Sequence, residues 1–256
     1  MILVIDIGNT NIVFGCMEDK KLLFSARLGS DVKKTPDEYC FLLKGILDLH
    51  QIPISAIEGG IISSVVPVLR DTLAQTAHML TGKNFLIVGI GLKTGLNVRM
   101  ETELGADLVT DAVAALAKYP LPCAVIDMGT ATTCFLLDRS GTYVGGLLMP
   151  GLRVSANALS GHTAQLPYVS LEAPPSVLGK KTVTAMQAGL IYGHAAMLDG
   201  IVDRVEEYAG EPVTAVITGG LARVVVPHCR RQFTYDENLL LDGLAILYEK
   251  NTRKGR

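Results

Sequence analysis

The sequence predicts a duplicated α/β fold, in which two halves each hold a mixed sheet flanked by helices and a cleft lies between the halves. Two observations support this prediction. Strand-like and helix-like segments alternate along the chain, and a strand-turn-strand segment near the N-terminus returns about one domain length later. The chain has 256 residues, of which 49% are hydrophobic and 19% charged, so it can bury one large core or two modest ones.

The first half is expected to cover residues 1–118. Apolar residues at helical spacing follow Thr35, which favours a helix N-cap and precedes a proline. At the end of this half, Val109, Val113 and Leu116 share one face of an alanine-rich helix. The expected elements, in order, are strands 1–14 and 21–27, helix 36–50, strand 57–65, helix 68–80, strand 85–89 and helix 106–118.

The second half, residues 119–256, begins with a copy of the chain's opening. When Asp6 is aligned with Asp127, 121 positions later, both copies read Val-Ile-Asp-x-Gly and both reach a phenylalanine, Phe14 and Phe135. A polar turn and another strand follow each copy. The remaining expected elements are helices 152–159, 184–208 and 238–251, with strand 214–218 before the last of them.

The repeated turn, D-x-G-[NT]-[TA], has the residues of a phosphate cradle. Its glycine lets successive backbone N–H groups point at one anion, and hydroxyl and amide side chains add donors. These donors are Asn9, Thr10, Asn11, Thr130, Thr132 and Thr133. A carboxylate beside phosphates needs a cation between them, so Asp6 and Asp127 are candidate metal or metal-water ligands. A single such turn is more typical of an ordinary solvated loop, but its duplication favours the functional interpretation.

Other classes of protein are excluded or disfavoured. The net charge of −2 with mixed signs gives no electrostatic argument for a nucleic acid or membrane partner. Five scattered cysteines without a C-x-x-C pair predict reduced, mostly buried thiols. The P-loop, the three-glycine dinucleotide fingerprint, H-E-x-x-H and G-x-S-x-G are all missing. The N-terminus has no leader pattern and no apolar run approaches about 18 residues, so a cytoplasmic protein is expected.

The two hairpins, together with "ITGGLA" at residues 217–222, resemble the superfamily of sugar kinases, acetate kinase, heat-shock chaperone ATPases and actin. This resemblance implies duplicated ribonuclease-H-like, or actin-like ATPase, domains. The chain also contains, in order, "LNVR", "GAD", "GGLLMPGL", "LSGHTAQLP" and "GKKTVTAMQAGL". With these motifs it resembles the type III pantothenate kinases over nearly its whole length.

The resemblance implies an ATP-dependent kinase that phosphorylates pantothenate to 4'-phosphopantothenate, the first step of coenzyme A biosynthesis. It also implies a homodimer that uses Mg²⁺ and a monovalent cation, K⁺ or NH₄⁺. Asp127 would bind the monovalent cation, and Asp6 is the second candidate metal ligand. The implied ATP-binding residues are Asp6, Ile7, Gly8, Asn9, Thr10, Asn11, Ile12, Val13, Thr130, Gly219 and Gly220.

On the acceptor side, the resemblance makes Asp107 the general base. Gly105, Ala106, Asp107 and Thr182 would bind pantothenate, with Thr182 acting across the dimer. The residues alone leave Asp107 open between a base and an ordinary first-turn aspartate that favours the helix dipole.

The sequence departs from the family pattern mainly at the acceptor end. Leu108 and His162 stand where arginine is usual or common, Met100 where an aromatic residue is usual, and Asp111 where asparagine is usual. Two alternatives therefore stay open beside pantothenate kinase. One is a kinase for a related small hydroxy acid or amide, and the other is a catalytically silent nucleotide-binding regulator.

Overall fold

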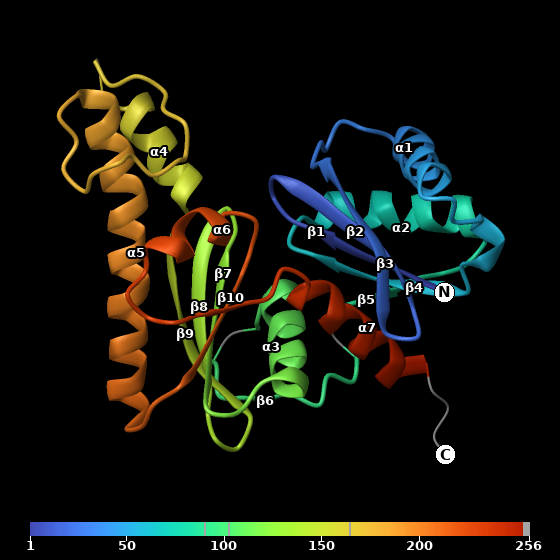
Figure 1. Cartoon of the computed structure of the whole chain (residues 1–256). Helices are drawn as coiled ribbons and strands as arrows, with labels where there is room; N and C mark the ends of the chain where they lie inside the picture. The colour runs from blue at the N-terminus through green and yellow to red at the C-terminus, as the bar shows by residue number, and fades with distance from the viewer. Residues whose placement is uncertain (90, 102, 164, 253–256) are drawn as a thin grey trace. The chain divides into compact units, whose positions relative to one another are not determined.

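The computed structural model describes residues 1–89, 91–101, 103–163 and 165–252, which form two compact units (Figure 1). Of these residues, the first unit takes 1–89, 91–96, 103–117 and 238–252, and the second takes 97–101, 118–163 and 165–237. Each unit is built on one mixed sheet. None of the helices described is long and apolar enough to cross a membrane.

The first unit holds a five-stranded sheet in the order β3-β2-β1-β4-β5. Its first three strands form the predicted antiparallel meander, and the other two run parallel to the first. The strands are β1 (Ile2–Ile7), β2 (Asn11–Glu18), β3 (Lys21–Gly29), β4 (Gly59–Ser64) and β5 (Leu86–Ile87).

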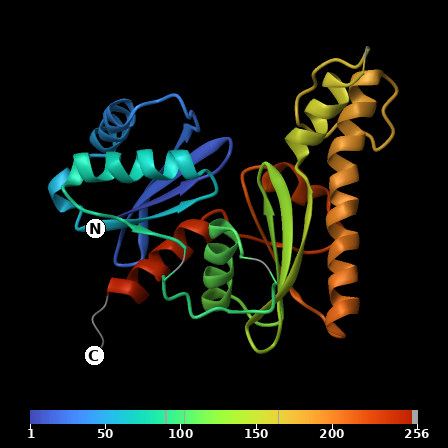
Figure 2. The same ribbon diagram turned by 180° about the vertical axis from the view of Figure 1, so that it is seen from behind.

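Two pairs of helices cover the two faces of this sheet (Figures 1 and 2). On one face lie α1 (Pro36–Leu49) and α2 (Pro67–Thr81), with the short 3₁₀ helix Ile54–Ala56 between them in sequence. On the other face lie α3 (Ala106–Lys118) and α7 (Leu239–Thr252). The predicted N-cap of α1 is confirmed, because Glu38 N–H donates to Thr35 Oγ1 while the Glu38 carboxylate accepts from Thr35 N–H.

The second unit repeats this arrangement with the strand order β11-β10-β7-β8-β9-β6. Strands β7, β8 and β9 are again an antiparallel meander, and β10 and β11 again run parallel to the first strand of that meander, β7. The predicted duplication is therefore confirmed at the level of strand topology. The strands are β6 (Asn97–Val98), β7 (Cys123–Met128), β8 (Ala131–Leu137), β9 (Thr142–Pro150), β10 (Thr214–Thr218) and β11 (Thr234–Tyr235).

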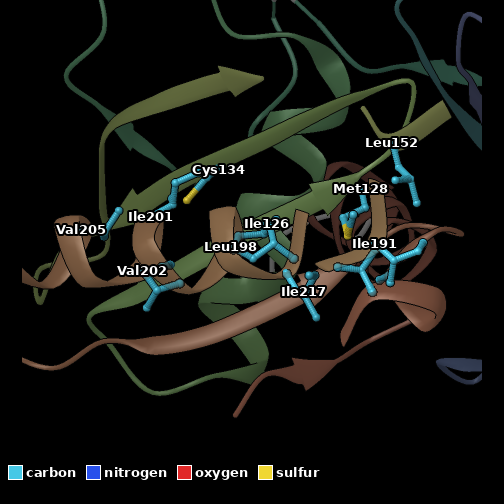
Figure 3. Packing of buried hydrophobic residues seen from close by; sticks show 14 of the residues in the cluster. Ile126, Met128, Cys134, Leu152, Ile191, Leu198, Ile201, Val202, Val205 and Ile217 are labelled. Carbon is cyan, nitrogen blue, oxygen red and sulfur yellow. The ribbon is translucent and has the colours of Figure 1, made fainter. Parts of the chain in front are cut away.

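The long helix α5 (Thr182–Ala209) provides much of the second unit's core. Figure 3 shows Ile191, Leu198 and Val202 of this helix packed with Ile126 and Ile217 of the sheet. Burial of such side chains contributes about 1.5–3 kcal/mol each. The other helices of the unit are α4 (Leu152–Gly161), α6 (Ala222–Val225) and the 3₁₀ turn Val226–His228.

Three features differ from the expected elements. Strand 85–89 shortens to the two residues of β5, and the two-residue strands β6 and β11 are additional. Contacts group α7 with the first unit, although the sequence analysis assigned residues 238–251 to the second half. The domain division at residue 118 and the cleft between the halves stay predictions. All five cysteines are free thiols and three of them are buried, as expected.

Candidate functional site

The first predicted phosphate turn joins β1 to β2. Gly8 N–H donates to the Asn11 carbonyl at 3.0 Å, which closes a tight turn, and Ser30 Oγ donates to the Gly8 carbonyl at 2.6 Å. A Cβ atom at Gly8 would lie 3.2 Å from the Asn11 carbonyl oxygen. The side chains of Asn9, Thr10 and Asn11 are exposed at the tip. Ser30, the residue after β3, thus holds the backbone of the turn, while the polar side chains of the turn face solvent.

Not every predicted ATP-binding residue in this hairpin can use its side chain. Ile7 and Ile12 are fully buried and pack in the core under α1 and α2. Only the backbone of these two residues can therefore contact a ligand. Asp6 and Val13 are half-buried, and they face each other across the β1–β2 ladder.

The second turn brings three predicted residues together in the second unit. Asp127 is the next-to-last residue of β7 and lies close to Gly129, and Thr130 is exposed at the tip before β8 begins. Gly219 has φ +94°, and a Cβ atom there would lie 2.6 Å from both Asp127 Oδ1 and the Met128 carbonyl oxygen. Only glycine combines this backbone angle with so close an approach. The "ITGGLA" segment, which includes Gly220, is therefore packed directly against Asp127.

Asp107 lies in the first turn of α3, as predicted. It is half-buried, and its Oδ1 accepts a hydrogen bond from Leu108 N–H at 2.8 Å. A Cβ atom at Gly105 would lie 2.5 Å from the same oxygen, so the glycine leaves room for the carboxylate. The hydrogen bond orients the carboxylate, and the position suits both a base and a residue that favours the helix dipole.

Thr182 is the first residue of α5 and is exposed. It lies on a different element from the second hairpin. Nearby, an apolar hollow of about 440 Å³ is lined by Val177, Leu178 and Gly179 and by α5 residues from Ala185 to Gly193. Leu178 is 81% exposed and Val177 63% exposed.

Hydroxyl residues that the sequence analysis did not select stand beside both motif aspartates. Ser63 on β4 is in register with Asp6, and Thr218 on β10 is in register with Asp127. Thr218 ends the predicted strand 214–218, and Ser63 lies near the end of the predicted strand 57–65. This position is the signal that could have found them, but only the strand pairing reveals the neighbour. Thr132 corrects an expectation: its side chain is fully buried on the core side of β8, so its hydroxyl does not face the turn.

The donor set fits a Mg²⁺ ion bound together with phosphates. Mg²⁺ keeps several waters and takes one or two carboxylates plus substrate oxygens. Among the residues described, no group of three or more His, Cys, Asp or Glu side chains gathers as a dedicated metal cage. Each unit instead provides one aspartate next to hydroxyl groups at a phosphate-type turn, which is the chemistry this ion requires.

Comparison with known proteins identifies close relatives. The model of the type III pantothenate kinase family matches residues 2–204. A type III pantothenate kinase of Exiguobacterium sp. is 42% identical over 255 residues, which cover 99% of this chain and 100% of the relative. One from Bacillus cytotoxicus is 41% identical over 253 residues, covering 98% of this chain and 97% of the relative.

Among solved structures, a 2-dehydro-3-deoxygalactonokinase from Sinorhizobium meliloti is similar over 100% of this chain and 98% of its own, with a TM-score of 0.61 and 11% identity. At this identity the likeness shows the fold alone. It confirms the predicted actin-like ATPase fold, in which two mixed sheets are flanked by helices.

Proposed function

Because the chain belongs to the type III pantothenate kinase family and is an ATP-dependent kinase that phosphorylates pantothenate in coenzyme A biosynthesis, we propose that its two hairpin turns bind ATP and that Asp107 acts on pantothenate. The main support for ATP binding by these residues is the close packing of Gly219 against Asp127, in the same unit as Thr130 of the second turn. The equivalent turn after Asp6 repeats the residue types in the first unit.

In this proposal the two turns hold the phosphates of ATP. The first hairpin contributes residues 6–13, with Asn9, Thr10 and Asn11 as side-chain donors and Ile7 and Ile12 acting through their backbone. Thr130, Gly219 and Gly220 contribute from the second unit. Backbone N–H groups at a turn suit phosphate oxygens because the turn fixes their direction before the ligand arrives. The exposed hydroxyl and amide groups can add further hydrogen bonds.

Asp107 is the proposed general base. It would accept the proton of the primary hydroxyl of pantothenate as the new oxygen–phosphorus bond forms and ADP leaves. Its hydrogen bond with Leu108 N–H supports this role, because the bond limits the rotation of the carboxylate. Gly105, Ala106 and Thr182 would contact pantothenate beside it.

Asp6 and Asp127 are the proposed cation ligands, with Asp127 binding the monovalent cation, K⁺ or NH₄⁺. Bound Mg²⁺ would neutralise charge that develops on the transferring phosphoryl group. The two aspartates would anchor the cations at the turns, since each carboxylate stands at the end of a strand and is held by the sheet.

A coupled assay of ADP release tests the proposed reaction. We expect ADP release only when pantothenate, ATP and Mg²⁺ are all present, and excess EDTA should lower the rate by about two to three orders of magnitude until Mg²⁺ is restored. Related hydroxy acids serve as competing acceptors. Equal rates with one of them, or full activity in EDTA, would contradict the proposal.

We also propose that two copies associate through the exposed apolar surface at the start of α5. Val177 and Leu178 are both more than half exposed there, and burying them against a second copy would remove apolar area from water. Thr182 lies at the same end of α5, so this contact would bring it next to the partner.

Replacing Leu178 by Asp should convert the dimer to a monomer, because the new carboxylate would have to be buried in an apolar contact. Light scattering coupled to size-exclusion chromatography measures the mass. Leu49→Asp is a matched control, since Leu49 is 80% exposed on α1 in the other unit. A wild-type monomer at assay concentration, or a Leu178→Asp dimer, would refute this interface.

A further inference from the structure

Ser63, the next-to-last residue of β4, carries a buried hydroxyl whose role the fold alone does not explain. Its side chain is 0% exposed, and Oγ has no hydrogen-bond partner among the described residues. Leaving a hydroxyl buried without a partner is destabilising. Such a group is well placed to form a hydrogen bond when a ligand changes its surroundings.

The neighbour of Ser63 is the first motif aspartate. β1 and β4 are parallel and place Asp6 directly in register with Ser63, so the two side chains lie on the same face of the sheet. Two residues earlier on each strand, Val4 and Ile61 pack on that face with α3 and α7. Neighbouring strands lie about 4.8 Å apart, a separation that a carboxylate can bridge to a serine hydroxyl by changing its rotamer.

The second unit repeats this juxtaposition. Thr218 on β10 is in register with Asp127, and β10 occupies the same place beside β7 that β4 occupies beside β1. Two separate strands have little reason to carry a hydroxyl residue at the one position that pairs with the aspartate. The repetition indicates that the hydroxyl serves the aspartate rather than its own strand.

We propose that Ser63 is a positioning residue for Asp6. When Mg²⁺ and ATP bind at the first hairpin, the Ser63 hydroxyl donates a hydrogen bond to the Asp6 carboxylate and holds it in the orientation that receives the cation. The inference rests on the proposed role of Asp6 as a cation ligand. It explains why a buried hydroxyl is kept at this position, since its partner becomes available only in the nucleotide-bound state.

The test is calorimetric titration of the full chain with a non-hydrolysable ATP analogue, with and without Mg²⁺. Ser63→Ala should raise the Kd of the analogue about tenfold in Mg²⁺, because a hydrogen bond to a charged group is lost, and should leave the Kd unchanged in EDTA. The Tm of the ligand-free Ser63→Ala protein should stay constant or rise by about 2–4 °C, because an unpaired buried hydroxyl is removed. An unchanged Kd in Mg²⁺ overturns the proposal.

Ser64→Ala is the matched control. The Ser64 hydroxyl donates to the Val66 carbonyl and accepts from Val66 N–H, both at 3.0 Å, so it supports the turn that leads into α2. Its replacement should lower the Tm and leave the Kd unchanged. If Ser63→Ala behaves in the same way, its role is structural and the proposal is overturned.

Asp6→Asn distinguishes the proposed role of Asp6 from the proposed role of Ser63. If Asp6→Asn leaves the Mg²⁺-dependent affinity intact, the proposed role of Asp6 itself fails. If Asp6→Asn weakens binding and Ser63→Ala does not, only the role of Ser63 fails. When both roles hold, adding Ser63→Ala to Asp6→Asn has little further effect, since the pair acts through one hydrogen bond.

Discussion

Asp107→Asn is expected to lower kcat by about two to four orders of magnitude while the chain stays folded. An amide cannot accept the proton of the pantothenate hydroxyl, yet it keeps the shape of the side chain and can still accept from Leu108 N–H. The coupled ADP-release assay at saturating ATP and pantothenate measures the change. The thermal transition of the variant checks that the fold is intact.

Asp37→Asn is the control for this substitution. Asp37 is the second residue of α1, as Asp107 is the second residue of α3, and it is exposed. Both changes remove an acid from the first turn of a helix, which costs about 0.3–1 kcal/mol of stability through the helix dipole. Asp37→Asn should therefore share the stability loss and keep the wild-type kcat. If Asp107→Asn also keeps the wild-type kcat, Asp107 only stabilises α3 and is not the general base.

Gly243→Ala is expected to reduce both stability and turnover. Gly243 on α7 packs against α3 so closely that a Cβ atom would lie 2.2 Å from the Thr110 carbonyl oxygen and 2.8 Å from its Cγ2. The two helices must move apart, at a cost of about 1–3 kcal/mol or more. Thr110 is about one turn from Asp107, so the shift would also displace the base, and a displacement of 1 Å can lower kcat about 100-fold.

Gly45→Ala is the same substitution in another helix, and it is expected to raise stability rather than lower it. Gly45 lies within α1, and a Cβ atom there would meet no other atom within 4 Å. Alanine at this position should raise the free energy of unfolding by about 0.5–1 kcal/mol, because it is the better helix former. Denaturant unfolding of both variants makes the comparison. Equal behaviour of the two variants would show that the close α3–α7 contact does not constrain the chain.

Much of the fold follows from local pattern. Thr35, Pro36 and Glu38 start α1 where the capping residues indicate, because an N-cap depends on neighbours within one turn. The start of α3 at Ala106 and its end at Lys118 also agree with the prediction. The two-residue strands are different. β6 at Asn97–Val98 is defined by its pairing with β9, and two residues carry no periodic pattern of their own.

The candidate site, like the fold, could be predicted from the sequence only in part. The paired Val-Ile-Asp-x-Gly segments mark the tight turns after β1 and β7, since turn chemistry depends on the residues of the turn itself. Thr132 lies on the core side of β8, whereas Thr130 lies in the turn before the strand and is exposed, a difference that the pattern of hydroxyl residues does not reveal. The individual roles proposed for Asp6, Asp107, Asp127 and Thr182 stay predictions for the experiments above.

Local sequence was thus sufficient for the type and order of the main elements, for the duplication and for the two tight turns, because helix caps, periodicity and tight turns act over a few residues. Long-range pairing was needed to group α7 with the first unit and to place Ser63 beside Asp6 and Thr218 beside Asp127. Strand register joins residues that lie 57 and 91 positions apart here. It is decided by the packing of whole sheets and helices, a sum over many distant contacts that no short segment contains.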